Sequence, residues 1–161
     1  RIERLSDPTS TGKMQYDLVW NFCEIEKQEQ PPRLLGNMLA LTRRYLLIIV
    51  QNRWNPGVIL HKIQHRLIGR EWDHGNIALM STRPTVESLS HFGRVIEIGY
   101  FDVPWFVLDI YESGALLRRS IPRSVSRSAL KLRRSRFEDL PSWCKKYLAH
   151  HSYILFERSA H

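Results

Sequence analysis

An unbroken apolar run, Tyr45-Leu46-Leu47-Ile48-Ile49-Val50, ends abruptly at the polar residues 51–53. The run does not alternate with polar residues, which is typical of a strand covered by helices on both faces. An earlier run, residues 16–22, predicts a second buried strand, and the proline pair that opens residues 31–44 predicts a helix between the two. A strand, a helix and a strand in close succession form the parallel crossover unit, so the predicted class is α/β.

The rest of the chain adds helices and strands of the same kind. We predict helices after Gly57 and over Thr85–His91, the latter capped by Gly93, and strands over Arg94–Tyr100 and Ser152–Arg158. A chain of 161 residues has the length of one domain. We therefore expect a single domain over 1–161, divided into a lead-in loop (1–15), core strands and helices (16–115), a basic helical insertion (116–150) and a last strand (151–159).

The excess positive charge is confined to one segment. The chain has 24 basic and 16 acidic residues, a net charge of +8, and residues 118–136 hold eight basic residues and no acidic one. Within this segment a basic stripe recurs every four residues on a predicted helix: Arg119, Arg123, Arg127 and Lys131. The stripe is either a solvated helix face or a contact surface for polyanions, so a non-catalytic basic binding module is the alternative function. Nucleic acid is not the favoured partner, because the segment lacks aromatic residues for base stacking.

Composition excludes several classes of protein. With 43% hydrophobic and 25% charged residues, the chain is typical of a globular protein and not of a disordered one. Its longest apolar run is far shorter than the about 20 residues that a membrane-spanning helix needs, so no membrane span is predicted. Two cysteines, Cys23 and Cys144, are too few for a disulfide framework, which favours a reducing, cytoplasmic location.

The histidines do not predict a metal site. His61 and His65 lie four residues apart on a predicted helix, a spacing that can hold a metal, but no recognisable third ligand completes the set. His150 and His151 are expected at the surface. The hydrolase Gly-x-Ser-x-Gly pattern and the P-loop are absent, which argues against hydrolases and nucleoside triphosphatases.

Taken in order, the segments from Tyr16 to Arg158 resemble the second half of a class I S-adenosylmethionine-dependent methyltransferase. The matching stretches are Tyr16–Asn21 (fourth strand), Leu46–Asn52 (fifth strand and its loop, with Gln51 where many members have proline), Glu71–Gly75 with Met80-Ser81, Gly93–Tyr100 (sixth strand) and Tyr153–Glu157 (seventh strand). In that family the seventh strand runs antiparallel between the fifth and the sixth. The resemblance implies an incomplete Rossmann-like methyltransferase sheet of the fourth to seventh strands.

The resemblance also implies S-adenosylmethionine as cofactor and methyl transfer to a small or medium acceptor. The family holds the donor on a Gly-x-Gly loop after its first strand, and this chain, which begins at Arg1, has no Gly-x-Gly. We therefore expect it to be the acceptor-side half of the domain, inactive on its own. The open edge of its first strand is then expected to self-associate or to join a partner chain.

Ligands of open α/β sheets bind at the carboxyl ends of the strands. This places Asn21, Phe22 and Glu24 at the donor and Asn52, Arg53 and Trp54 at the acceptor, unless these side chains only cap turns or fill loops. The predicted catalytic residues are His74, as the general base that takes a proton from the acceptor, and Asp102, which is expected to face the acceptor pocket. The alternative for His74 is a ring that only bonds a loop carbonyl.

Overall fold

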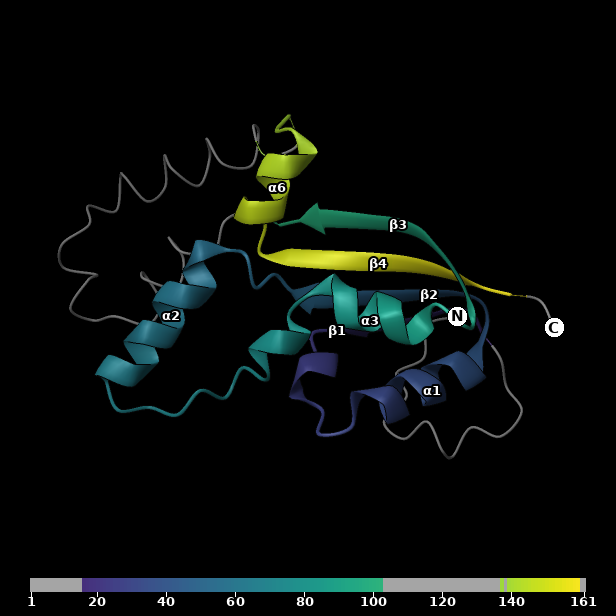
Figure 1. Cartoon of the computed structure of the whole chain (residues 1–161), viewed down its shortest axis with the longest axis horizontal. Helices are drawn as coiled ribbons and strands as arrows, with labels where there is room; N and C mark the ends of the chain where they lie inside the picture. Colours follow the sequence, from purple (N-terminus) through teal and green to yellow (C-terminus); the bar gives the residue numbers. More distant parts are fainter. Residues whose placement is uncertain (1–15, 103–136, 138, 160–161) are drawn as a thin grey trace. The chain divides into compact units, whose positions relative to one another are not determined.

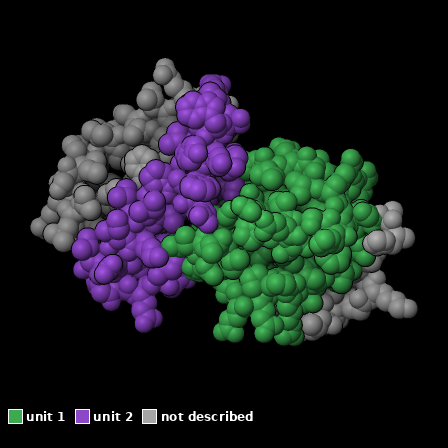
Figure 2. Space-filling model, in the orientation of Figure 1, with its two compact units in different colours: residues 1–50, 75–99, 153–161 green, residues 51–74, 100–152 purple. Residues whose placement is uncertain are grey.

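The structure, a computed structural model, describes residues 16–102, 137 and 139–159. Its elements, in chain order, are β1 (Tyr16–Phe22), η2 (Ile25–Lys27), α1 (Pro31–Leu41), β2 (Thr42–Gln51), α2 (Pro56–Leu67), η3 (Ile77–Leu79), α3 (Thr82–Leu89), β3 (Gly93–Phe101), α6 (Ser142–Leu148) and β4 (His151–Arg158) (Figure 1). The chain divides into two compact units, residues 1–50, 75–99 and 153–161 (unit 1) and residues 51–74 and 100–152 (unit 2) (Figure 2). The mixed α/β class is confirmed.

The four strands form one sheet in the order β1-β2-β4-β3. β1 and β2 are parallel, as the crossover unit predicts. β4 is antiparallel to both of its neighbours (Figure 1). Next to β3, the N–H of Ser159, which follows β4, donates to the carbonyl of Phe92, which precedes β3. Next to β2, the N–H of Asn52, which follows β2, donates to the carbonyl of His150, which precedes β4. The prediction of an antiparallel last strand between its two neighbours is confirmed.

The core of unit 1 lies on one face of this sheet. Side chains of β1, β2 and β4 that point to this face are buried together with side chains of α1 and α3. The strands contribute Val19, Leu46, Ile48, Val50 and Phe156, and the helices contribute Leu35, Met38, Leu39 and Leu89. Arg158, the last residue of β4, connects this strand to the end of α1 and the start of β2. Its guanidinium donates to Leu39 O over 2.9 Å and to Thr42 O over 2.6 Å. A cation at the carboxyl end of α1 satisfies carbonyls that the helix leaves open.

β1 is not the buried strand that its apolar run predicts. Leu18, Trp20 and Phe22 are 48%, 56% and 46% exposed, and of this strand only Val19 is buried. Among the described strands β1 pairs with β2 alone, so it lies at the end of the sheet. Alternate residues of a strand point to opposite faces, and the helices described here cover only the face of Val19.

Three boundaries of the predicted helices are wrong. The first helix ends at Leu41 rather than at Arg44, because β2 begins at Thr42. The Thr42 hydroxyl donates a hydrogen bond to Met38 O over 2.7 Å. α3 begins at Thr82, three residues before the predicted start, with the Ser81 side chain accepting from the Arg83 N–H. The helix is over before Gly93, which opens β3 instead of capping α3.

The basic stripe and the lead-in loop lie outside the described residues. Of the predicted insertion over 116–150, the structure describes α6 and the residues next to it. Within the described part of the chain, no helix has both the length and the apolar character needed to cross a membrane.

Candidate functional site

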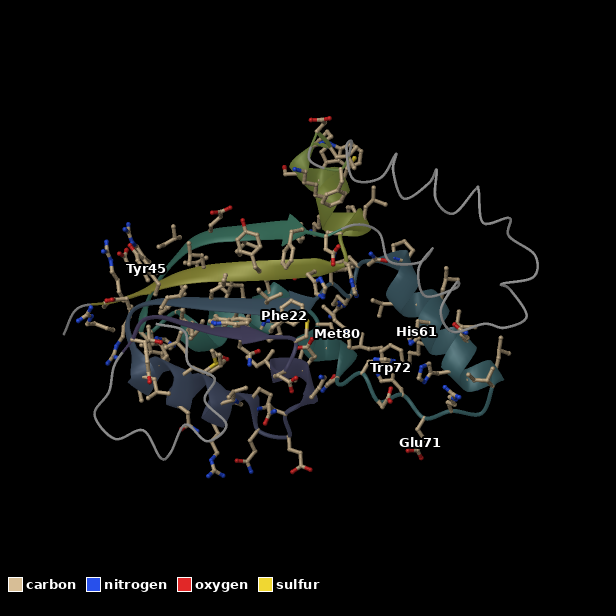
Figure 3. All side chains as sticks on the ribbon, turned by 180° about the vertical axis from the view of Figure 1, so that it is seen from behind. Phe22, Tyr45, His61, Glu71, Trp72 and Met80 are labelled. Carbon is tan, nitrogen blue, oxygen red and sulfur yellow. The ribbon has the colours of Figure 1, made fainter. Side chains whose placement is uncertain are left out.

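The carboxyl end of β1 lies beside that of β2, as predicted. Asn21 is in register with Ile48, and Phe22, which closes β1, is in register with Ile49. The Cys23 N–H extends the pairing by donating to Ile49 O over 2.9 Å. Figure 3 shows Phe22 at this end of the strand.

The predicted donor residues stay together after the strand ends. The Asn21 side chain accepts from the Glu24 N–H over 3.4 Å, which is the turn-capping role left open for it. The exposed Glu24 carboxylate pairs with Lys27 over 3.1 Å. Since an exposed ion pair of this kind contributes little stability, Glu24 can exchange Lys27 for a ligand at small cost.

Cys23 turns the chain out of β1. Its φ of 52° lies in the left-handed region, where residues other than glycine are uncommon. Its thiol is buried beside Glu26, and burial, followed by the charge of Glu26 and a hydrogen bond to it, raises the pKa of the thiol from 9.0 to about 12. Cys23 is therefore a structural thiol and not a nucleophile at neutral pH.

We expect Cys23 to resist alkylation in the folded protein. A thiol with a pKa of about 12 is only about 0.01% ionised at pH 8, and the thiolate is the reactive form. Mass spectrometry after iodoacetamide treatment at pH 8 should find Cys144, which is only half-buried, modified and Cys23 intact. Unfolding in urea should make the two cysteines equally reactive, and equal labelling before unfolding would contradict the burial of Cys23.

Gly75, in the stretch that resembles a His-Gly motif, packs against the turn after β1. Its φ is 94°, and a Cβ there would come within 2.5 Å of Glu26 O. The Asn76 N–H donates to the same carbonyl over 2.6 Å. Glycine is therefore required by both the backbone conformation and the close approach.

Asn52, a predicted acceptor residue, is buried inside unit 2. Its side-chain amide donates to Lys146 O over 2.8 Å and to Ala149 O over 2.9 Å, and its side-chain oxygen accepts from the Trp54 N–H. Asn55 acts in the same way, since it donates to the end of α6 and caps the start of α2. Both amides join the start of α2 to the end of α6.

Arg53 and Trp54, the other predicted acceptor residues, lie at the surface of unit 2. The Trp54 ring is 46% exposed and has the Arg53 guanidinium 4.9 Å and the Lys146 ammonium 5.8 Å from its centroid. Tyr147 meets it edge-on, with the centroids 6.3 Å apart. An exposed aromatic ring with two cations close to it is suited to a flat or anionic ligand.

His74, a predicted catalytic residue, is part of a cluster with the two histidines of α2. Its Nε2 lies 2.9 Å from His61 Nε2, which lies 3.1 Å from His65 Nε2. Asp73 is beside it, with Oδ1 3.3 Å from His74 Nε2. The sequence did not predict that His74 joins His61 and His65, because the loop after α2, with Gly69 at a φ of 67°, brings it back onto the helix.

Burial sets the charge of the His61 ring. It is the largest of the causes that lower the pKa of His61 from 6.5 to about 4, and the neighbouring His74 and His65 lower it further against an opposing effect of Asp73. The His61 ring is therefore neutral at pH 7.

Asp102, the second predicted catalytic residue, meets the two histidines at the start of β4. Its Oδ2 is 3.3 Å from His151 Nδ1 and 3.7 Å from His150 Nδ1. The expectation that these histidines lie at the surface is wrong for His151, which is 6% exposed and stacks on Phe101. Burial lowers the pKa of His151, and Asp102 partly opposes the shift. Asp102 itself has a φ of 68°, a rare conformation that aspartate tolerates better than most residues.

No family model matches the chain, and neither does any curated protein. Solved structures do match, among them a crystal structure of the MccD protein, with 10% sequence identity and a TM-score of 0.43. The match covers 96% of this chain and 66% of the other, so the chain spans less than two thirds of that protein's length. A likeness of this size identifies neither a family nor an activity.

Proposed function

We propose that the chain belongs to an S-adenosylmethionine-dependent methyltransferase and forms the acceptor-side half of its domain. The observation that carries the proposal is the strand order β1-β2-β4-β3, with β1 and β2 parallel and β4 antiparallel to its neighbours. In the family that the sequence resembles, the fourth, fifth, seventh and sixth strands are arranged in this way. A strand that returns between two earlier ones is a specific topology, because strands that follow each other in the chain usually lie next to each other.

The residues after β1 fit one wall of a donor site. Glu24 offers an exposed carboxylate to the ammonium or hydroxyl groups of S-adenosylmethionine, and Phe22 offers an exposed ring. The glycine-rich loop that would complete the site is absent from this sequence. When bound, S-adenosylmethionine supplies an electrophilic methyl group, and methyl transfer then depends mostly on proximity and orientation.

Asp102 and His151 are the groups we propose for the acceptor's proton. An acceptor hydroxyl or amine loses a proton as it takes the methyl group, and a neutral imidazole next to a carboxylate can receive it. His74 is the other predicted catalytic residue. Its Nε2 already contacts both His61 and Asp73, so an acceptor would have to displace one of them.

The exposed row on β1 supports the proposal that this chain is half of a larger sheet. Leu18, Trp20 and Phe22 recur at every second residue and leave an apolar strip on the outermost described strand. An edge strand of this kind is normally paired or covered. We propose that upstream strands and helices of the same protein cover it, and that the chain without them self-associates.

Calorimetric titration of S-adenosylmethionine into the protein with its native upstream sequence tests the function. We expect saturable binding, and about a tenfold rise in Kd for Glu24→Gln, which removes one charge-assisted contact. Glu29→Gln, an exposed acid in the loop before α1, is the matched control and should bind as tightly as the wild type. Absence of binding in the wild-type protein would overturn the proposal.

A further inference from the structure

Three histidine nitrogens meet at one point in unit 2. The Nε2 atom of His61 lies 2.9 Å from that of His74 and 3.1 Å from that of His65, and the cluster's ligand atoms all lie within 4.8 Å of one another. Nitrogens that share a tetrahedral ion at the usual zinc–nitrogen distance are about 3.3 Å apart. The cluster therefore has the spacing of a three-histidine metal site.

The hydrogen bonds around His65 show what its nitrogen offers to the cluster. The Nδ1 atom of His65 lies 2.7 Å from the backbone oxygen of Glu71, and a carbonyl only accepts, so Nδ1 carries a proton. In the neutral ring Nε2 then has a lone pair that faces His61. In metal sites, a hydrogen bond from the far ring nitrogen to a carbonyl orients the histidine ligand toward the metal in the same way.

Hydrogen bonds between the rings explain the short distances between the three Nε2 atoms less well than a shared metal cation does. His61 Nε2 faces two other ring nitrogens at once, and a single N–H points well at only one acceptor. A cation would accept a lone pair from each of the three rings.

The surroundings also suit a metal centre. Trp72 lies edge-on to all three rings, with centroids 5.8 Å from His61, 5.6 Å from His65 and 4.9 Å from His74 (Figure 3). Such an apolar neighbour limits the access of water to the site. Asp73 adds a negative charge 3.3 Å from His74 Nε2, which offsets part of the charge of a divalent ion.

We propose that His61, His65 and His74 bind a transition-metal dication, Zn²⁺ in the first place, through their Nε2 atoms. Imidazole ligands select zinc and its neighbours in the first transition row over Mg²⁺ and Ca²⁺, which prefer oxygen. Three protein ligands leave a fourth position for water or for the Asp73 carboxylate. The site is built from unit 2 alone, and it does not depend on the proposed methyl transfer.

Metal titration of the full chain, first stripped with a chelator, tests this proposal. Calorimetry should show one Zn²⁺ bound per chain and no binding of Mg²⁺, and Co²⁺ should develop the visible absorption of a tetrahedral site. We expect His65→Gln and His74→Gln each to weaken Zn²⁺ binding by about 100-fold or more, because each removes one of three ligands. His91→Gln, an exposed histidine outside the cluster, is the control and should leave binding unchanged.

Two further measurements keep the result unambiguous. Circular dichroism of the metal-free variants should match that of the metal-free wild type, and Zn²⁺ should raise the Tm of the wild type but not of either variant. His151→Gln tests the other group of potential ligands, Asp102 with His150 and His151. The proposal is overturned if the wild type binds no zinc, if binding survives in both cluster variants, or if it is lost in His151→Gln alone.

Discussion

Replacing Asn52 with alanine is expected to lower the free energy of unfolding by about 3 kcal/mol. The side chain is 1% exposed, and its amide donates to two carbonyls at the end of α6, those of Lys146 and Ala149. Alanine leaves both acceptors without this donor, and each buried group that loses its partner costs about 1–3 kcal/mol. The loss of the contact with the Trp54 N–H adds to the effect.

Urea unfolding monitored by circular dichroism measures this loss, and Asn76→Ala is the matched control. Asn76 also caps a short helix, by accepting from the Ala78 N–H, but it is exposed, so its replacement should cost about 1 kcal/mol or less. Equal, small losses for the two variants would mean that Asn52 does not hold α6. That outcome would return Asn52 to its predicted role as a residue that contacts the acceptor.

Residues 45–50 show what could be predicted from the sequence: the strand is confirmed, but its predicted cover by helices on both faces is wrong, since Leu47 and Ile49 are only half-buried. An apolar run needs no partner to be recognised as a strand, and its polar end marks where the strand stops. The exposure of residues 16–22 could not be predicted in the same way. It depends on how many strands and helices lie beside β1, and the apolar sequence of β1 does not contain that information. Val19 and Trp20 are adjacent residues of the same apolar run, but one is 8% and the other 56% exposed.

The histidine cluster could be predicted only in part. The spacing of His61 and His65 places both on one side of a helix, which is a local property. The third ligand, His74, comes from a loop, and its return to α2 depends on turn conformations such as that of Gly69 that no periodicity encodes. The buried position of His151 was missed for a similar reason, since two adjacent histidines look like a surface pair until β4 is placed inside the sheet.

The proposed function depends on the position of β4 between β2 and β3. Phe156→Ala should lower the free energy of unfolding by about 3–5 kcal/mol, the usual cost of truncating a buried aromatic ring. Phe156 is 0% exposed and belongs to the cluster formed with β2 and α1. Its neighbour Leu155 points to the other face and is only half-buried, so Leu155→Ala should cost about 1 kcal/mol.

The difference between these two variants separates a central strand from an edge strand. Phe156 packs in the core cluster with residues of β2 and α1, so we expect its truncation to cost more than that of Leu155 when β4 lies between β2 and β3. An edge strand that had merely docked on β3 would lose little from either change. Urea unfolding curves of the two variants, fitted with a common slope, give the comparison directly. If Phe156→Ala costs no more than Leu155→Ala, β4 does not lie between β2 and β3, and the methyltransferase proposal loses the strand order on which it rests.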